Sequence, residues 1–493
     1  MLENIKMRKL LYKTLNFELD LKSTFFREGT GISNLDGRLW EEAGAETGRY
    51  FGDEALVRAR VGIEARYLIA LSKTGIVRKF TNKEEETLLN LHKKITPKVY
   101  GDLRIIEAET RHDVITMTQI MKKLLLNNKS LTDIIDHGWV HWGLSSEDID
   151  NLSKNILISN YLKDVYLPRL AGTLTEIVRL SDKTKGVTIP GKTHLQTAIP
   201  TTLGKEIALF GIRLAENYEK IKKLKLKGKL TGAVGNLSAH KSAYPKINWR
   251  KVSREFVESL GLEANLYTTQ IEPKTKLIEL FGFMQNINSI LIDLSQDMRL
   301  YIGFDWLSQE VKKEEFGSSA MPQKVNPIDF ENAHGNALFS NWILEGLIRQ
   351  LPISWLQRDL VDKTIFRNIG LPFGYSLISL ISTNKGLSRL TPNKEKIKEE
   401  LESDWSALAE AFQINLRAVG LGNAYDNLKE LARGKKLTGE DIHEWIKKLK
   451  ADSKIKKRLY RISHENYTGY AKENCEEMIK KILVIAKKPL LSS

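Results

Sequence analysis

The sequence has very little cysteine and proline and no long hydrophobic run. Its 493 residues include one cysteine, Cys475, so no disulfide can form within the chain, and a disulfide-stapled secreted protein is excluded. The 12 prolines are about half of the usual share of residues, which is typical of helical proteins. No apolar run approaches the ~18 residues that a membrane span requires. We therefore expect a soluble, cytoplasmic, all-α protein that does not enter a membrane.

The charge of the chain is unbalanced. It carries 76 Lys and Arg against 61 Asp and Glu, a formal net charge of +15. Such an excess suggests nucleic acid as a partner, because clustered cations neutralise phosphates. The densest cluster, from Lys220 to Lys229, lies at the C-terminal end of a predicted helix, where positive charge is favourable. No aromatic residue is interleaved with it, so we expect a solvated helix end and no nucleic-acid partner.

Long periodic helices are the main structural signal. Apolar residues repeat in three- and four-residue steps from Leu277 to Tyr301, which predicts one long bundle helix. Its other face carries polar residues such as Asn288, which we expect to contact solvent or a partner. Two further long helices are predicted over residues 146–166 and 201–227. Helices of this length usually pack into multi-chain bundles.

Two changes in composition divide the chain. Helical patterns are shorter before about Trp139, and residues 391–394 open a strongly charged helical region. We predict three helical domains, over residues 1–136, 137–390 and 391–493, with a long-helix bundle in the middle one. The basic start of the chain is too short in its apolar part for a signal peptide. Residues 1–30 are therefore predicted to be an extension of unknown role.

The segment most informative about chemistry is the stretch from 317 to 327, GSSAMPQKVNP. Two prolines five residues apart interrupt regular backbone, so the segment is predicted to be a loop between helices. It offers two hydroxyls in Ser318 and Ser319, an ammonium in Lys324 and a carboxamide in Asn326. A deprotonated hydroxyl could act as a base. The other two groups suit a carboxylate that gains charge while a proton is removed beside it.

This loop resembles the signature of the fumarase/aspartase superfamily of lyases, G-S-S-x-M-P-x-K-x-N-P. Three further blocks match in order: residues 110–114 (TRHDV), 145–149 (SSEDI) and 193–196 (THLQ). Within the superfamily, the sequence is most similar to the adenylosuccinate lyase family. The stretches that carry this similarity are 33–38 (SNLDGR), 231–240 (TGAVGNLSAH), 267–273 (YTTQIEP), 326–332 (NPIDFEN) and 357–368 (QRDLVDKTIFRN). The resemblance extends from about residue 33 to residue 472.

The resemblance implies β-elimination of fumarate from a succinylated amine. Ser318 resembles the base that removes the proton beside a carboxylate, and which serine of the 318–319 pair loses its own proton stays open. His194 resembles the general acid that protonates the leaving nitrogen, a role that suits imidazole because its pKa lies near neutral pH. Thr193 and Gln196 flank it as possible supporting residues. His141 resembles a second active-site histidine, with a structural histidine at a helix entry as the alternative.

The resemblance also implies a site for a nucleotide monophosphate. Arg358 and Arg367 match the phosphate-side positions of the family, and the planar fork of arginine suits phosphate geometry. The same resemblance implies these substrate-binding residues: Arg38, Arg111, His112, Asp113, Ser145, Ser146, Gln270, Ser319, Lys324, Asn326, Asn332, Arg358, Lys363, Thr364 and Arg367.

Four positions depart from the pattern of the family. They are Leu39, where tyrosine is usual, Arg111, where some members have asparagine, Leu195, where glycine is usual, and Lys363, where serine is usual. Arg111 and Lys363 add positive charge near the nucleotide end. This charge either strengthens phosphate binding or marks a different succinylated amine as the substrate. The residues implied in the elimination itself are all present.

Taken together, the resemblance implies an amidine-type carbon–nitrogen lyase of purine biosynthesis without a metal or redox cofactor. Its small-molecule substrates would be adenylosuccinate, giving AMP and fumarate, and the succinylaminoimidazole carboxamide ribotide, giving AICAR and fumarate. A homotetramer with active sites shared between subunits is also implied. Two alternatives stay open. One is another fumarate-releasing lyase, for argininosuccinate or a different adduct, and the other is a non-catalytic helical or nucleic-acid-binding protein.

Overall fold

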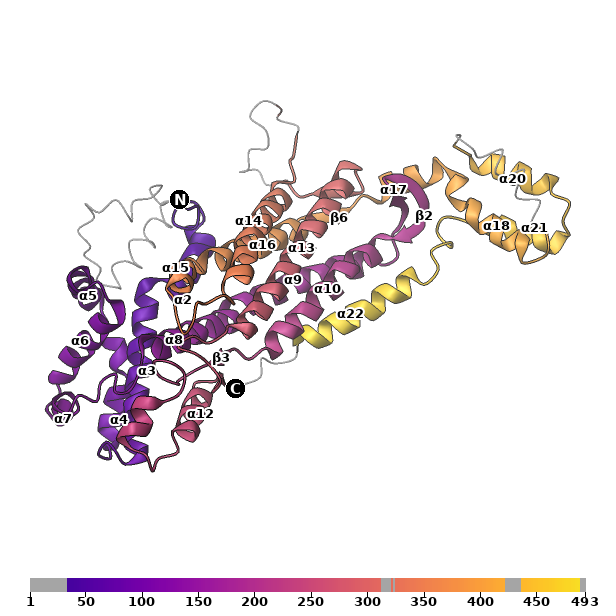
Figure 1. The fold of residues 1–493 in the computed structure, drawn as a ribbon. Helices are drawn as coiled ribbons and strands as arrows, with labels where there is room; N and C mark the ends of the chain where they lie inside the picture. Colours follow the sequence, from indigo (N-terminus) through magenta and orange to yellow (C-terminus); the bar gives the residue numbers. More distant parts are fainter. Residues whose placement is uncertain (1–32, 312–320, 322–323, 422–435, 488–493) are drawn as a thin grey trace.

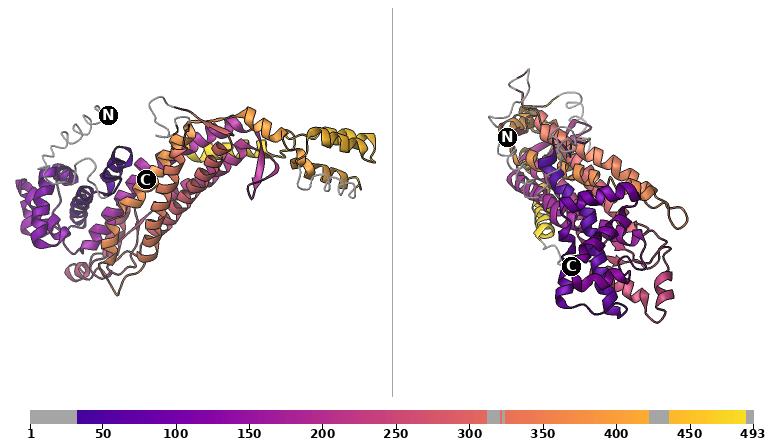
Figure 2. Two further views of the ribbon diagram at one scale, coloured as in Figure 1. Left: turned by 90° about the horizontal axis from the view of Figure 1, so that it is seen from above. Right: turned by 90° about the vertical axis from the view of Figure 1, so that its left-hand side faces the viewer.

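The computed structural model describes residues 33–311, 321, 324–421 and 436–487 of the chain. Helices dominate this part and strands are few and short, so the all-α prediction is confirmed (Figure 1). The molecule is elongated, with a long helical bundle between two smaller groups of helices (Figure 2). The N-terminal helices lie at one end of the bundle and α18, α20 and α21 at the other.

The N-terminal group contains one long helix and several short ones. Its elements are η2 (Trp40–Gly44), α2 (Ala45–Phe51), α3 (Asp53–Thr74), α4 (Asn82–Leu89), η3 (Leu91–Lys94), α5 (Pro97–Thr110), α6 (Asp113–Leu126), η4 (Lys129–Leu131) and α7 (Thr132–Asp136). The prediction of only short helical patterns here is wrong for α3, which has 22 residues. Arg60, Glu64 and Tyr67 interrupt its apolar pattern, yet all three side chains are buried.

The central bundle holds most of the long helices. Its elements are α8 (Ser146–Tyr161), η5 (Leu162–Tyr166), α9 (Leu167–Thr184), α10 (Leu203–Lys223), α11 (Ser238–Ala243), α12 (Trp249–Ser259), α13 (Thr275–Gly303), α14 (Ile328–Gln350), α15 (Val361–Phe366) and α16 (Gly370–Ser388). The helix predicted over residues 146–166 continues beyond Tyr166 into α9, because only a π-helical turn separates α8 from α9. The helix predicted over residues 201–227 is α10 and is shorter than predicted, since Thr201 belongs to a strand and the helix ends at Lys223.

The described residues also form three two-stranded sheets. The pairs are antiparallel β1 (Thr188–Thr193) with β2 (Gln196–Thr202), parallel β3 (Lys227–Gly228) with β4 (Glu263–Ala264), and antiparallel β5 (Leu307–Gln309) with β6 (Leu390–Pro392). In the first pair, Thr193 is the partner of Gln196, so the hairpin turn consists of two residues.

The helix α13 is the centre of the bundle and packs against α10, α14 and α16. The prediction that Asn288 contacts solvent or a partner is wrong, because its side chain is fully buried. Its amide donates to Ser340 Oγ at 3.0 Å and to Asn341 Oδ1 at 2.9 Å, and its carbonyl accepts from Ser376 Oγ at 2.7 Å. By length and composition alone α13 could cross a membrane, but half of its most apolar window is buried among these helices.

The described C-terminal residues form two separate structures. The elements are α17 (Lys394–Glu402), η6 (Trp405–Leu408), α18 (Ala409–Arg417), α20 (Gly439–Lys448), α21 (Ser453–Tyr460) and α22 (Ala471–Lys487). A core of its own, including Phe412, Ile442 and Leu459, holds η6, α18, α20 and α21 together. The last helix, α22, instead returns along α10 and α9, where Ile482 joins the main core (Figure 1).

Candidate functional site

The signature loop lies largely outside the described residues. Neither Ser318 nor Ser319 is described, so their predicted roles rest on the sequence. Lys324 is exposed and its backbone donates to Met321 O at 3.0 Å. Asn326 is half-buried just ahead of α14. Lys324 and Asn326 therefore both lie just ahead of the N-terminal end of α14.

His194 is exposed at the tip of the β1–β2 hairpin. His194 and Leu195 both have positive φ, 52° and 61°, as a two-residue type I′ turn requires. Glycine adopts this conformation without strain, which gives a physical reason for glycine as the usual family residue at 195. Figure 1 shows β2 near α17, whereas α3, α6 and α8 lie at the opposite end of the bundle. One copy of the chain thus keeps His194 apart from the helices described next.

Four charged side chains, Arg60 and Asp150 buried and Asp113 and Lys363 partly buried, meet where α3, α6, α8 and α15 converge. Arg60 Nη2 lies 2.8 Å from Asp113 Oδ2, and Arg60 Nε donates to Asp150 Oδ1 at 2.7 Å. Lys363 Nζ lies 2.7 Å from Asp113 Oδ1 and 3.3 Å from Asp150 Oδ2. Burial raises the pKa of Asp113, but Arg60 and Lys363 outweigh it and hold this pKa well below its usual range. Two cations and two carboxylates neutralise one another in this cluster.

A cavity of about 190 Å³ opens beside this cluster. Five cations and three acids line it: Arg60, Arg104, Lys154, Lys363 and Arg367 against Asp53, Glu107 and Asp113. Tyr100 also lines it, and burial raises the pKa of its hydroxyl to about 12. A complete nucleotide needs a pocket of at least about 300 Å³, but a phosphate group fits here. The excess of cations favours such an anion.

A second set of predicted residues meets around Arg358. Its Nη1 donates to Gln270 Oε1 at 2.8 Å and lies 3.4 Å from Glu147 Oε2. Gln270 Nε2 donates to the carbonyl of Ala233 at 2.7 Å. Burial raises the pKa of Glu147. These contacts bring together the blocks at 145–149, 231–240, 267–273 and 357–368.

The segment before α6 places three predicted residues at its start. Arg111 has a φ of 52° at the end of α5 and is exposed. His112 is the N-cap of α6, where its Nδ1 accepts from the backbone of Ile115 at 3.2 Å. A left-handed residue between two helices turns the chain sharply, so Asp113 points to the cluster while Arg111 stays outside it.

The start of α8 is fixed by a capping interaction between Ser145 and Asp148. Asp148 Oδ2 accepts from the backbone and the hydroxyl of Ser145, at 2.8 and 3.0 Å. Asp148 Oδ1 accepts from Lys229 Nζ at 2.9 Å. The predicted solvated lysine cluster is therefore wrong for Lys229, which is completely buried. An aspartate in the first turn of a helix is a common cap, so nothing in the sequence pointed to a buried partner for Asp148.

His141 lies in the loop ahead of α8 with a φ of 63°. Its Nδ1 lies 2.5 Å from Glu64 Oε1. Burial disfavours the imidazolium, but Glu64 outweighs burial and raises the pKa of His141. Sequence reasoning missed Glu64, as it missed Arg60, because both lie in the apolar pattern of α3. Their spacing of four residues is the only signal that could have linked them.

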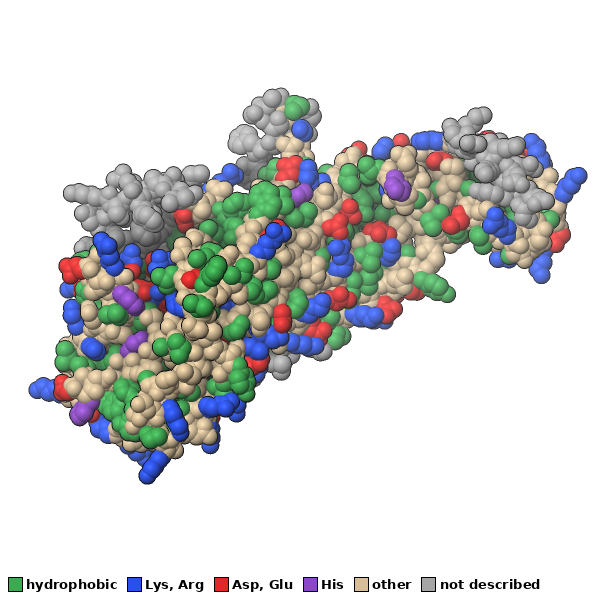
Figure 3. Space-filling model, in the orientation of Figure 1, with side chains coloured by type: hydrophobic (Ala, Val, Ile, Leu, Met, Phe, Trp, Pro, Cys, Tyr) green, Lys and Arg blue, Asp and Glu red, His purple; other side chains and the backbone are tan. Residues whose placement is uncertain are grey.

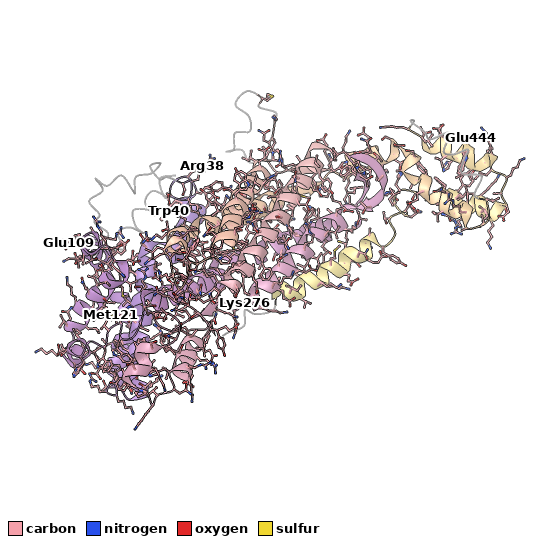
Figure 4. The ribbon with its side chains drawn as sticks, in the orientation of Figure 1. Arg38, Trp40, Glu109, Met121, Lys276 and Glu444 are labelled. Atoms are coloured by element: carbon pink, nitrogen blue, oxygen red, sulfur yellow. The ribbon has the colours of Figure 1, made fainter. Side chains whose placement is uncertain are left out.

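The other predicted residues lie at the surface of the described chain. Figure 4 shows Arg38 beside Trp40 at the start of the described residues, ahead of α2. Thr364 Oγ1 donates to the backbone of Leu360 at 3.2 Å. The exposed or half-buried remainder comprises Ser146, Thr193, Gln196, Asn332 and Arg367. Their roles stay predictions. Across the ranges that the structure describes, no group of three or more His, Cys, Asp or Glu is arranged to hold a metal ion.

Comparisons with known proteins agree along nearly the whole chain. Residues 49–338 match the family model described as lyase, and residues 354–468 match the one described as adenylosuccinate lyase C-terminal. The chain is 38% identical over 452 residues to the adenylosuccinate lyase of Haemophilus influenzae, covering 91% of this chain and 98% of that protein. It is 36% identical over 452 residues to that of Escherichia coli K12, with the same coverage.

Solved structures share the fold at low sequence identity. The 3-carboxy-cis,cis-muconate lactonizing enzyme of Pseudomonas putida superposes with a TM-score of 0.73 at 18% identity, covering 90% of this chain and 98% of that one. A fumarate lyase from Mesorhizobium superposes with a TM-score of 0.72 at 16% identity, covering 89% and 98%.

Proposed function

The chain belongs to the adenylosuccinate lyase family, and from this premise we propose that it cleaves adenylosuccinate to AMP and fumarate. It is a carbon–nitrogen lyase, and the same elimination extends to the succinylaminoimidazole carboxamide ribotide, giving AICAR. The observation that carries the proposal is 38% identity over 91% of the chain, together with matches to both family models. No metal or redox cofactor is needed for this chemistry. The proposed reactions belong to purine biosynthesis.

The elimination needs a base, an acid and a group that holds a carboxylate. Ser318 takes the proton from the carbon beside that carboxylate, and the electrons of this bond form the double bond of fumarate. The carbon–nitrogen bond breaks, and its electron pair goes to nitrogen, which takes a proton from His194. Lys324 and Asn326 hold the carboxylate while its negative charge grows. An exposed imidazole at a hairpin tip supports the role of His194, because it can reach into a site built by another element.

The nucleotide end is assigned to the cavity and to Arg358. Five cations against three acids leave a net positive lining that suits phosphate. Lys363 takes part through Asp113, since its ammonium is engaged there at 2.7 Å. Arg358, held by Gln270 at 2.8 Å, is proposed as a further cation for this end of the substrate. Arg38, Arg111, His112, Ser145 and Ser146 complete this side of the site.

We propose a cytoplasmic homotetramer in which each active site draws on more than one copy. The support is the separation of His194 from α3 and α15 within one copy (Figure 1). Side chains such as Phe339 and Trp342 leave apolar area exposed on α14, at 40% and 61%.

We also propose three domains, divided at about residues 136 and 390. The last helix, α22, packs on the middle domain.

The alternatives are separated by a direct assay. Purified protein is followed by ultraviolet absorbance with adenylosuccinate, argininosuccinate and aspartate. Turnover of adenylosuccinate is expected, and activity only on argininosuccinate or only on aspartate would contradict the proposal. A nucleic-acid-binding protein would instead show salt-sensitive binding that Ser318→Ala leaves unchanged. Figure 3 shows Lys and Arg spread over the visible face and mixed with Asp and Glu, which argues against such a surface.

A further inference from the structure

One face of α3 carries a buried polar stripe. Arg60, Glu64 and Tyr67 are spaced by four and three residues, so their side chains lie on the same side of the helix. Their exposed fractions are 3%, 0% and 0%. A buried charge is costly unless a partner compensates it. The stripe is therefore expected to serve the residues that it contacts.

Each member of the stripe contacts a different part of the candidate site. Arg60 joins α6 to α8 through Asp113 and Asp150. Glu64 binds His141 in the loop ahead of α8. Tyr67 Oη lies 2.7 Å from His240 Nε2 and 3.2 Å from the carbonyl of Trp142. The blocks at 110–114 and 231–240, far apart in sequence, and the residues on either side of the block at 145–149 are thus supported by one helix.

The contact between Glu64 and His141 is the most specific of the three. The two atoms lie 2.5 Å apart, within hydrogen-bond distance, and beside a carboxylate oxygen Nδ1 acts as the donor. The hydrogen bond of His141 to another described residue engages Nδ1, and its side chain is 22% exposed, so Nε2 is available to a ligand. The second carboxylate oxygen of Glu64 is buried without a partner in the same part of the chain. Glu64 therefore gains only one bond from being buried here.

The backbone around His141 is held in an uncommon conformation. His141 has a φ of 63° and Gly143 a φ of 70°. A Cβ at Gly143 would lie 2.8 Å from the imidazole of His240, so only glycine fits there. Strain of this kind persists where the surroundings fix it, and it is concentrated at functional sites.

The charged groups around His141 favour its protonated form. Glu64 faces it from α3, and Asp148 and Asp150 face it from α8. Asp148 is neutralised by Lys229, and Asp150 by Arg60. Glu64 is the negative group in direct contact with the imidazole. These contacts together raise the pKa of His141 in spite of its burial.

Building on the proposed lyase function, we propose that Glu64 is a positioning residue for the reaction: it fixes the ring of His141 and keeps it protonated, so that Nε2–H is presented to an anionic group of the substrate. Glu64 acts through His141 and does not itself contact the substrate. Its loss is therefore expected to change the protonation of His141 before it changes the fold.

The test compares Glu64→Gln and Glu64→Asp with the unaltered protein and with Glu54→Gln. The protonation of His141 is followed by NMR of protein with ¹³C-labelled histidine, with His141→Gln assigning the signal. Glu64→Gln is expected to lower the pKa of His141 by about 1–3 units, and Glu64→Asp by less, because it keeps the charge. The alkaline limb of the kcat/KM profile is expected to move to lower pH in the same order.

The control Glu54→Gln makes the same chemical change on the same helix, where Glu54 pairs with Arg58 across one turn. It is expected to leave both readouts unchanged. If the pKa of His141 in Glu64→Gln equals that of the unaltered protein, the proposal is overturned. If Glu64→Gln does not fold, the unaltered protein decides, because a His141 pKa at or below the ordinary 6.5 overturns the proposal too. Absence of lyase activity would instead overturn the proposed function, and the titration would still decide the role of Glu64.

Discussion

At the scale of residues, the predicted site residues fall into two groups, those held in ion pairs and those exposed. Asp113, Lys363 and Arg358 lie in partly buried ion pairs that fix their positions. His194 and Lys324 are exposed and unconstrained by such pairs in the described chain. Groups that bind a constant part of a substrate benefit from fixed positions. A general acid has to meet the leaving nitrogen, and an exposed tip allows this.

The role of His194 is tested by His194→Ala. The variant is expected to lose at least a factor of about 10² in kcat, the usual contribution of a placed acid. Steady-state ultraviolet kinetics with adenylosuccinate measure it. His137→Ala removes another exposed histidine and is expected to keep full activity. Full activity in His194→Ala would show that another group protonates the nitrogen.

The cluster around Lys363 is tested by Lys363→Met. The change leaves Asp113 with Arg60, and Asp150 with Arg60 and the more distant Lys154, so the free energy of unfolding is expected to fall by about 1–3 kcal/mol at neutral pH. Because the folded pKa of Asp113 lies below its ordinary 3.8, the stabilisation is complete above that pH and is lost as pH falls through the folded value. The difference between the two proteins in urea unfolding should therefore shrink below about pH 4.

A matched control for this variant is Lys385→Met. Lys385 pairs with Glu42 at the surface, with exposed fractions of 46% and 39%, so its loss should be nearly silent. An equal and pH-independent loss in both variants would mean that Lys363 acts only through its apolar stem.

The sequence was informative about residues that match motifs and uninformative about their partners. Arg358 and Gln270 were both predicted in the substrate site, and the structure brings them together. Glu64 and Lys229 could not be predicted, since a buried charge in an apolar pattern reads as a surface residue until its partner is known. Their partners, His141 and Asp148, are 77 and 81 residues away along the chain.

At the scale of elements, one buried polar network joins the long helices. Asn288 of α13 contacts Ser340 and Asn341 of α14 and Ser376 of α16. Tyr166 Oη lies 2.9 Å from Ser376 Oγ and extends the network to the end of η5. Each member has a specific partner, so the network fixes how these helices are aligned.

The variant Asn288→Leu tests this network. It leaves the hydroxyl of Ser376 without its acceptor, and the free energy of unfolding is expected to fall by about 1–3 kcal/mol. Chemical denaturation measures the change. Thr175→Ala, which removes an exposed hydroxyl of α9 that donates to the backbone of Ala171, should stay within about 0.5 kcal/mol of the unaltered protein. A neutral or stabilising Asn288→Leu would mean that packing alone aligns the helices.

Periodicity predicted the existence of the long helices better than their ends. The pattern from Leu277 to Tyr301 lies within α13, because an uninterrupted apolar seam leaves little choice. The ends of α10 were wrong by two residues at the start and four at the finish, where strand pairing takes over the backbone. Such pairing is a tertiary interaction, and local pattern does not contain it.

At the scale of the whole molecule, the elongated shape separates the parts of the proposed site. The hairpin with His194 and the cavity beside Lys363 lie toward opposite ends of the bundle (Figures 1 and 2). Neither the shape nor this separation could be predicted from the sequence, since both depend on how the long helices pack. An active site that needs both parts has to be completed by another copy.

The most direct measurement mixes two inactive variants, Ser318→Ala and His194→Ala. Each is expected to be inactive alone while remaining tetrameric. The two variants are then dissociated and reassembled together. Some sites of the mixed tetramers combine intact Ser318 from one variant with intact His194 from the other, so activity on adenylosuccinate should return in part. Native mass spectrometry confirms that mixed tetramers have formed. Mixed tetramers without any regained activity would contradict the shared site.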